Sequence, residues 1–271
     1  MPRTTLHKIS LMLGKLAGFA FACTLLLQPA HAAPPRTFSA TYNASYEGIS
    51  AGAQRSLTFD EDTNQYTLAS TVELTLFGSS LTRIDERSDF LWVEEQPLPQ
   101  HYEFVQTGFG ARKRTIDFDH AKGIAKFTIN DDRGELMLDG PAFDELSGYL
   151  VAKEQLTQGK AEARFDVVDR GEIREHHYRI VNRVMLQTPL GRIKAVHLER
   201  IRGEDSARKT EIWLAPDHDY LLLKLVQTEP DGDTIELAIR SATLGEHELS
   251  AATLEAASNR AQFSPDAAPV P

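Results

Sequence analysis

The chain has 271 residues, and its 29 Lys and Arg against 39 Asp and Glu give a net charge of −10. This acidic balance argues against nucleic acid as a partner and against electrostatic binding to anionic lipid surfaces. The single cysteine, Cys23, excludes an intramolecular disulfide and any metal site with several cysteine ligands.

The first 32 residues have the layout of a secretory signal peptide. Arg3 and Lys8 give a positive start, residues 16–27 form an uncharged and mostly apolar run, and residues 30–32 (Ala-His-Ala) fit a cleavage site. As a helix this run would be about 18 Å long, too short for a hydrocarbon core of about 30 Å. The alternatives are an uncleaved anchor and a lipoprotein, but Cys23 lacks the Leu that usually stands three positions before a lipidated cysteine. We therefore expect cleavage and no remaining transmembrane span.

Cleavage after Ala32 would change the composition of the chain. It would remove three basic residues, no acidic residue and Cys23, and so leave a net charge near −13 and no thiol. Residues 33–271 are numerous enough for one large core or two small ones. Such a domain has to be held together by its core alone.

From residue 37 onward, short runs of β-forming residues alternate with turn residues. Short links of two to five residues indicate antiparallel neighbours, and Pro97 and Pro99 separate two of the expected strands. The expected strands are 37–46, 54–59, 66–76, 84–93, 102–107, 112–118, 124–129, 135–138, 163–168, 173–181, 184–187, 192–202, 209–214, 220–228 and 234–244.

One segment, residues 143–157, has apolar residues at helical spacing. Asp144 is a suitable N-cap, and Gly159 is a suitable end. The sequence therefore predicts a mainly β fold, in which a curved antiparallel sheet or half-barrel of about 10–12 strands has one main helix packed on it. We expect a signal peptide at 1–32, a β-rich domain at 33–245, and a mobile Ala- and Pro-rich tail at 246–271.

No catalytic, cofactor or metal motif stands out, so we expect no cofactor and no metal. His176 and His177 are adjacent on an expected strand and would point to opposite faces, which prevents them from sharing one metal ion. Residues 60–64 resemble the start of a calcium loop, but Gln65 stands where the loop needs Gly, and Thr71 stands where it needs Glu.

Several fragments, in a fixed order, resemble the exported bacterial family DUF3108, a domain of unknown function. The fragments are 85–90 (DERSDF), 97–99 (PLP), 117–119 (DFD), 144–147 (DELS), 188–191 (TPLG) and 211–217 (EIWLAPD). The resemblance covers about 38–244, with one departure, since 221–224 reads Leu-Leu-Leu-Lys where the family tends to have Leu-Pro-Val. It implies a periplasmic location and a curved β-rich fold of the kind seen in periplasmic lipid carriers, and it brings no known activity or catalytic residues.

Three functional hypotheses follow. The first is a non-enzymatic binder of a lipid, another hydrophobic ligand or an envelope partner, with a cavity near the predicted helix in which Asp144, Ser147, Tyr149 and Trp213 are the candidate ligand-binding residues. The second is a structural or scaffold protein of the cell envelope that pairs through an edge strand or its C-terminal tail. The third, less favoured, is an envelope hydrolase in which Asp144 and Ser147 would meet a distant histidine.

Overall fold

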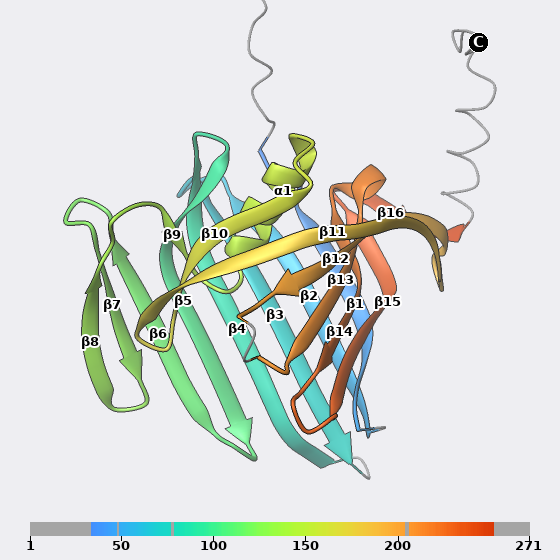
Figure 1. The fold of residues 1–271 in the computed structure, drawn as a ribbon, viewed down its shortest axis with the longest axis horizontal. Helices are drawn as coiled ribbons and strands as arrows, with labels where there is room; N and C mark the ends of the chain where they lie inside the picture. Colours follow the sequence, from blue (N-terminus) through green and yellow to red (C-terminus); the bar gives the residue numbers. More distant parts are fainter. Residues whose placement is uncertain (1–33, 48, 77–78, 204–205, 252–271) are drawn as a thin grey trace, which may run out of the picture. The chain divides into compact units, whose positions relative to one another are not determined.

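The computed structural model describes residues 34–47, 49–76, 79–203 and 206–251. Within these ranges the chain forms one large, almost entirely antiparallel sheet that curves around a single α-helix (Figure 1). The predicted signal peptide and residues 252–271 of the predicted tail lie outside the described residues.

The first half of the sheet is a meander of eight strands in which each strand pairs with the next. Short turns join the strands, so neighbours run antiparallel. The strands are β1 (Phe38–Tyr46), β2 (Ile49–Asp60), β3 (Gln65–Leu76), β4 (Ser79–Val93), β5 (Gln96–Gly108), β6 (Arg112–Asp119), β7 (Ile124–Ile129) and β8 (Asp132–Met137).

The chain then crosses to the other end of the sheet and forms the second meander. The crossing contains β9 (Ala142–Phe143), which pairs in parallel with β10, and the helix α1 (Gly148–Thr157). The remaining elements are β10 (Glu162–Asp169), β11 (Glu172–Thr188), β12 (Gly191–Ile201), β13 (Lys209–Ala215), the 3-10 turn η1 (Pro216–His218), β14 (Leu221–Thr228), β15 (Thr234–Leu244) and β16 (His247–Leu249).

The two meanders join along the ladder between β1 and β15. The strand order runs from β8 down to β1 and then from β15 back to β9. Phe38 pairs with Leu244 and Tyr46 with Ile235, with one irregularity after Thr41. A single continuous sheet therefore contains the first and the last long strands side by side.

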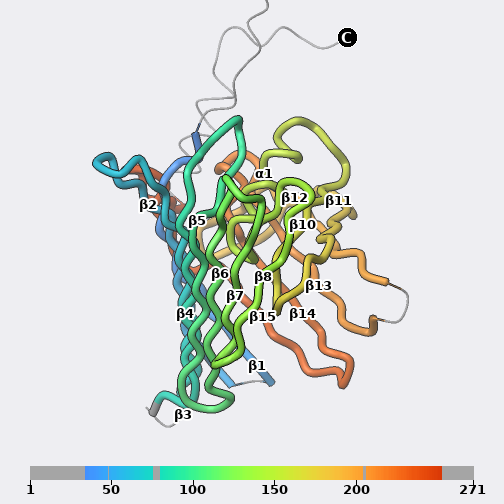
Figure 2. Tube along the Cα trace, turned by 90° about the vertical axis from the view of Figure 1, so that its left-hand side faces the viewer, coloured from blue at the N-terminus to red at the C-terminus, as the bar shows by residue number. Residues whose placement is uncertain are grey.

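The core lies between the concave face of the sheet and α1. Figure 2 shows strands β3–β5 and strands β11–β13 on opposite sides, with α1 between them at one end. Leu57, Leu68 and Phe90 of the first meander are almost fully buried. Leu150 and Leu156 of α1 pack into the same core, so the helix covers one end of the concave face.

Side chains bridge the two ends of the sheet. Arg114 on β6 forms a largely buried ion pair with Asp169 at the end of β10. The ring of Phe127 on β7 covers Gly171 in the turn after β10, where an added Cβ would lie 2.8 Å from the ring. The same ring would be 2.3 Å from a Cβ at Gly134 on β8. Close packing, rather than a strand ladder, thus links these ends in the described part of the chain.

The predicted fold class is confirmed: the protein is mainly β, with a curved sheet that is not closed into a barrel and one helix packed on it. The sheet has sixteen strands rather than about 10–12. Two of the additional strands, β9 and β16, are too short to produce a hydrophobic alternation. β16 also lies within the region expected to be a tail. No helix of the described ranges has the length and apolarity of a transmembrane span.

Two strand boundaries differ from the prediction for identifiable reasons. Pro97 and Pro99 lie inside β5 rather than between strands. β5 pairs with β6 only from His101 onward, so the prolines occupy a stretch where one edge of β5 needs no N–H donor. The expected strands 173–181 and 184–187 form the single strand β11, because an irregularity between Ile180 and Asn182 absorbs the break in alternation.

The helix begins later than predicted. Phe143 belongs to β9, and the N-cap is Ser147 rather than Asp144. Asp144 instead stabilises the turn before the helix, because its Oδ1 accepts hydrogen bonds from the backbone N–H groups of Leu146 and Ser147. Gly159 follows the helix with a φ of 82°, in agreement with its predicted role as the helix end.

Candidate ligand-binding cavity

The concave face holds a cavity of about 350 Å³ beside the first turns of α1, here named the central cavity. Strands of both meanders line it, together with Glu145, Leu146, Tyr149 and Ala152 from the helix segment. Its volume falls at the lower end of the range of small-molecule sites, roughly 300–1,000 Å³.

One side of the central cavity is apolar. Leu198 on β12, Leu214 on β13 and Leu237 on β15 line it, and Ile212 and Leu225 extend the same wall. Every second side chain of a strand points to the concave face, so the alternating leucines of the second meander converge there. This wall is suited to a hydrocarbon group.

Charged side chains from several strands, here named the charged wall, also line the central cavity. Arg55 comes from β2, Glu86 from β4, Arg114 from β6, Asp169 from β10 and Arg200 from β12. Burial of charged groups is costly unless they are paired or hydrogen-bonded, so a cluster of this kind needs a specific reason.

Only part of this cluster is paired within the described chain. Arg114 pairs with Asp169, and Glu86 accepts a hydrogen bond of 2.8 Å from the hydroxyl of Tyr102. The guanidinium of Arg55 lies 4.5 Å from the centre of the Tyr149 ring. These contacts fix the positions of the charges around the cavity.

Three buried polar atoms at this wall have no hydrogen-bond partner among the described residues. They are the hydroxyl of Tyr42, the Nε of Arg55 and the Nε of Arg114. Tyr42 is only 3% exposed. The great majority of buried polar groups in native proteins are hydrogen-bonded, and so these three atoms point to a missing partner inside the cavity.

Burial also shifts the protonation of the cavity groups. It raises the pKa of the Tyr42 hydroxyl and of the Glu86 carboxyl above their usual values. Burial and the nearby Asp169 carboxylate raise the pKa of Glu145 to about 7. Burial, with the positive charge of Arg200 second, lowers the pKa of His176 to about 3. His176 is therefore neutral at pH 7.

The structure brings two of the predicted site residues together but not into the cavity lining. Asp144 and Ser147 are both fully buried. The Asp144 Oδ2 accepts hydrogen bonds of 2.7 Å from the hydroxyls of Ser147 and Ser88, while the Ser147 hydroxyl oxygen accepts one from the backbone N–H of Asp144. These bonds join the turn before α1 to strand β4, so both residues position the helix.

The two predicted aromatic residues lie in different places. Tyr149 lines the central cavity, and its hydroxyl donates a hydrogen bond to the carbonyl of Tyr220. Trp213 is not among the lining residues. It stacks on the ring of His197, with 4.3 Å between the ring centres, and the Nζ of Lys224 lies 5.7 Å from the centre of the Trp213 ring. Its neighbours Ile212 and Leu214 face the cavity, and so Trp213 points the opposite way.

The hydrolase arrangement is not assembled around Ser147. Its hydroxyl donates to the Asp144 carboxylate, and no histidine of the described residues is hydrogen-bonded to it. The nearby imidazole of His176 faces Glu145 instead, at 3.9 Å from Nε2 to Oε1. Among the described residues, no three His, Cys, Asp or Glu side chains are placed to hold a metal ion.

The residues of the charged wall were not predicted, although the sequence contains a signal for them. Arg55 stands between Ala53 and Leu57 in the inward phase of β2, and Glu86 shares the inward phase of β4 with Phe90. A charged residue in the apolar phase of a strand indicates either a polar interior or a site.

Comparisons with known proteins concern the fold more than the activity. A family model described as a protein of unknown function, DUF3108, matches residues 41–239. The structure is similar to a β-barrel-like protein of the domain of unknown function DUF1849 from Brucella abortus, with a TM-score of 0.53, 8% identity, and coverage of 79% of this chain and 99% of that one. At this identity the likeness shows the fold alone.

Two further structures have much lower similarity. MucB in complex with MucA(peri) is 11% identical, and the MucA/MucB complex of Pseudomonas aeruginosa is 10% identical. Each has a TM-score of 0.15 and covers 78% of this chain and 90% of the other chain, so neither supports an argument. No curated protein matches the sequence significantly.

Proposed function

The chain belongs to the DUF3108 family, and on that premise we propose that it is an exported periplasmic protein that binds an amphiphilic molecule in its central cavity without reacting with it. The hydrocarbon part of the ligand would contact the leucines of the second meander. Its polar part would face Tyr42 and Arg55. The alternative functions are a scaffold of the envelope and, less favoured, an envelope hydrolase.

The observation that carries this proposal is the pair of buried donors, without partners among the described residues, in a cavity that also has an apolar wall. The Tyr42 hydroxyl and the Arg55 Nε both line the central cavity and lack partners among the described residues. An unsatisfied buried donor costs about 1–3 kcal/mol, and a ligand acceptor would remove that cost. A purely hydrocarbon ligand would leave both donors unsatisfied.

The proposed location rests on the N-terminal sequence. The basic start, the short apolar run and the cleavage site at 30–32 fit export through a cleaved signal peptide. A domain that has no cysteine after cleavage does not depend on the thiol chemistry of the compartment.

Native mass spectrometry of protein purified from a bacterial periplasm tests the binding function. We expect a bound species with the mass of a lipid or another amphiphile. The variant A53F should lower its occupancy at least about tenfold, because the ring would enter the space that the ligand occupies. The matched control is A69F, which places the same ring on the opposite face of the neighbouring strand β3.

Absence of any bound amphiphile, or equal occupancy in A53F and A69F, would contradict the proposal. The scaffold alternative is favoured by one observation, the 86% exposed side chain of Phe109 at the turn between β5 and β6. If A53F retains an envelope partner that F109S loses, the partner-binding function replaces the ligand-binding one.

A further inference from the structure

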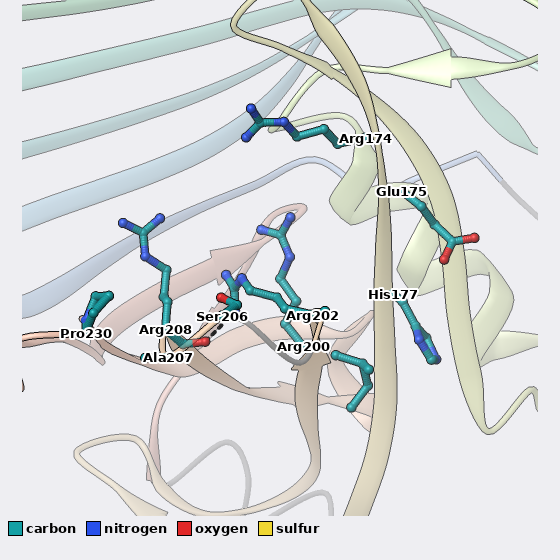
Figure 3. A pocket seen from close by; sticks show the side chains of 11 residues that line it. Arg174, Glu175, His177, Arg200, Arg202, Ser206, Ala207, Arg208 and Pro230 are labelled. Carbon is teal, nitrogen blue, oxygen red and sulfur yellow. Dashed lines mark hydrogen bonds between the residues drawn. The ribbon is translucent and has the colours of Figure 1, made fainter.

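A second pocket of about 730 Å³ opens beside the central cavity, where β11 and β12 approach the start of β13. Four arginines line it, Arg174, Arg200, Arg202 and Arg208, and together they define what we name the arginine groove. In Figure 3 their guanidinium groups extend into the same open space, whereas the side chains of Glu175 and His177 point away from it.

The arginine groove and the central cavity meet at one residue. Arg200 lines both pockets. Its guanidinium lies 6.0 Å from the centre of the Tyr178 ring, which also lines the central cavity. A molecule with two parts can therefore occupy the cavity and the groove at the same time.

Two of the four guanidinium groups have no carboxylate partner among the residues that the structure describes, which leave out Glu204 and Asp205. Arg202 donates hydrogen bonds to the Thr210 hydroxyl at 2.9 Å and to the Arg208 carbonyl at 3.3 Å. Neither Arg202 nor Arg200 has a carboxylate of the described residues within ion-pair distance. The other two arginines are more exposed and each pairs with a surface carboxylate, Arg174 with Glu172 and Arg208 with Glu229.

The positive charges of the groove repel one another. Burial and the charge of Arg200 lower the pKa of Arg202 to about 10, so the side chain remains charged at neutral pH. Arg200, Arg202 and Arg174 also contribute to the low pKa of His176 nearby. Adjacent half-buried cations that no described carboxylate pairs at close range are unfavourable, and a bound anion would compensate for them. The groove is basic although the chain as a whole has a net charge of −10.

We propose that the arginine groove binds the phosphate group of an anionic amphiphile whose hydrocarbon chain lies in the central cavity together with a polar linkage that accepts from Tyr42 and Arg55, an inference that rests on the proposed function. Guanidinium groups bind phosphate oxygens through paired, charge-assisted hydrogen bonds. Arg202 is oriented in advance by Thr210 and by the Arg208 carbonyl, which lowers the entropy lost on binding. The shared residue Arg200 places the phosphate at the junction of the groove and the cavity.

Isothermal titration of the mature chain with three probes tests this inference. The probes are a lysophosphatidylglycerol and a monoacylglycerol with the same 14-carbon chain, and inorganic phosphate. We expect the anionic lipid to bind at least about tenfold more tightly than the uncharged one. The preference should weaken with added salt, as expected for an exposed electrostatic contact.

The variant R202Q/R208Q should lose this preference, because both side chains line the arginine groove and neither lines the central cavity. The matched control is R133Q/R240Q, which removes two exposed arginines outside both pockets. The single variant R208Q changes only an exposed side chain and should lose part of the preference for the anionic lipid. It keeps the test decisive if the double variant does not fold.

The outcomes separate the two proposals. Equal affinity for both lipids, or a preference that survives in R202Q/R208Q, overturns the phosphate site and leaves the amphiphile cavity in place. If inorganic phosphate binds in the groove and neither lipid binds, the groove is a site for free phosphate, and the proposal that a lipid supplies the phosphate group is wrong. Failure of both lipids and of phosphate to bind overturns the proposed function and the groove together.

Discussion

Tyr42 is the residue at which stability and binding are expected to oppose each other. Its hydroxyl is buried in the cavity wall and has no partner among the described residues. Tyr102 provides a natural contrast, because it is equally buried but its hydroxyl donates to Glu86 at 2.8 Å. One hydroxyl therefore costs stability in the empty protein, and the other contributes to it.

The substitution Y42F should raise the free energy of unfolding of the ligand-free protein by about 1 kcal/mol, since it removes an unsatisfied buried group. The same substitution should weaken amphiphile binding by roughly three- to tenfold through the loss of one hydrogen bond. Denaturant unfolding and titration measure the two effects. The control Y102F should lower the unfolding free energy. A loss of stability in Y42F would show that Tyr42 has an internal partner.

Glu145 is expected to make the stability of the domain depend on pH. Burial and Asp169 raise its pKa to about 7 in the folded state from 4.5. The folded state therefore binds more protons than the unfolded state between these values, so the stability from this group is fully present below pH 4.5 and is lost as the pH rises through 7.

In the variant E145Q the side chain at position 145 is neutral at every pH, so its free energy of unfolding should not fall as the pH rises through 7. At pH 8 its free energy of unfolding should exceed that of the wild type by about 1 kcal/mol, because one pKa unit corresponds to 1.36 kcal/mol and solvent screening reduces the effect at a side chain one-third exposed. At pH 4 the two proteins should agree. Denaturant unfolding at both pH values, with E61Q as an exposed control, measures the difference. If E145Q and the wild type differ in unfolding free energy at pH 4 as much as at pH 8, the pH dependence does not come from Glu145.

At the level of elements, the position of α1 depends on a close contact with β10. A Cβ added at Gly148, the first residue of the helix, would lie 2.5 Å from the Phe165 ring. The turn before the helix is fixed on the other side by the bonds of Asp144 to Ser88 and Ser147. The helix is thus attached to a strand of each meander.

The substitution G148A should lower the free energy of unfolding by about 1–2 kcal/mol, because the methyl group overpacks the ring. Without the clash, alanine would instead favour the helix by up to about 1 kcal/mol. The double variant G148A/F165L should recover much of the loss, and a double-mutant cycle by denaturant unfolding measures this coupling. Additive effects of the two substitutions would show that the two residues do not press on each other.

Most helices and strands were predictable from the sequence, and the errors in their predicted bounds have identifiable causes. Hydrophobic alternation and turn residues located most strands, as in β1, β3 and β15. The start of α1 was misplaced because Phe143 fits both a helical spacing and the two-residue strand β9. Pro97 and Pro99 were misread because their effect depends on which edge of β5 is paired, and pairing is a tertiary property.

For the whole domain, the sequence predicted a curved sheet with a helix, but of the four candidate residues only Tyr149 lines the central cavity. The charged wall combines residues of five strands, from Arg55 on β2 to Arg200 on β12, and no local pattern connects them. Asp144 and Ser147 are close to the predicted helix, as expected, but their side chains hydrogen-bond to each other in the turn before it. The phase of β13 turns Trp213 away from the cavity that Ile212 and Leu214 line.

The ladder between β1 and β15 joins residues that are far apart in the sequence, and this has a consequence for folding. Each meander is built from neighbouring hairpins, which form quickly because they close short loops. Pairing of Phe38 with Leu244 closes a loop of about 200 residues, which costs about 5 kcal/mol in chain entropy. We therefore expect the ladder between β1 and β15 to form after the hairpins of each meander. Until it forms, the free edge of β1 is a template for pairing with other chains, so we expect aggregation to be most pronounced at that stage of folding.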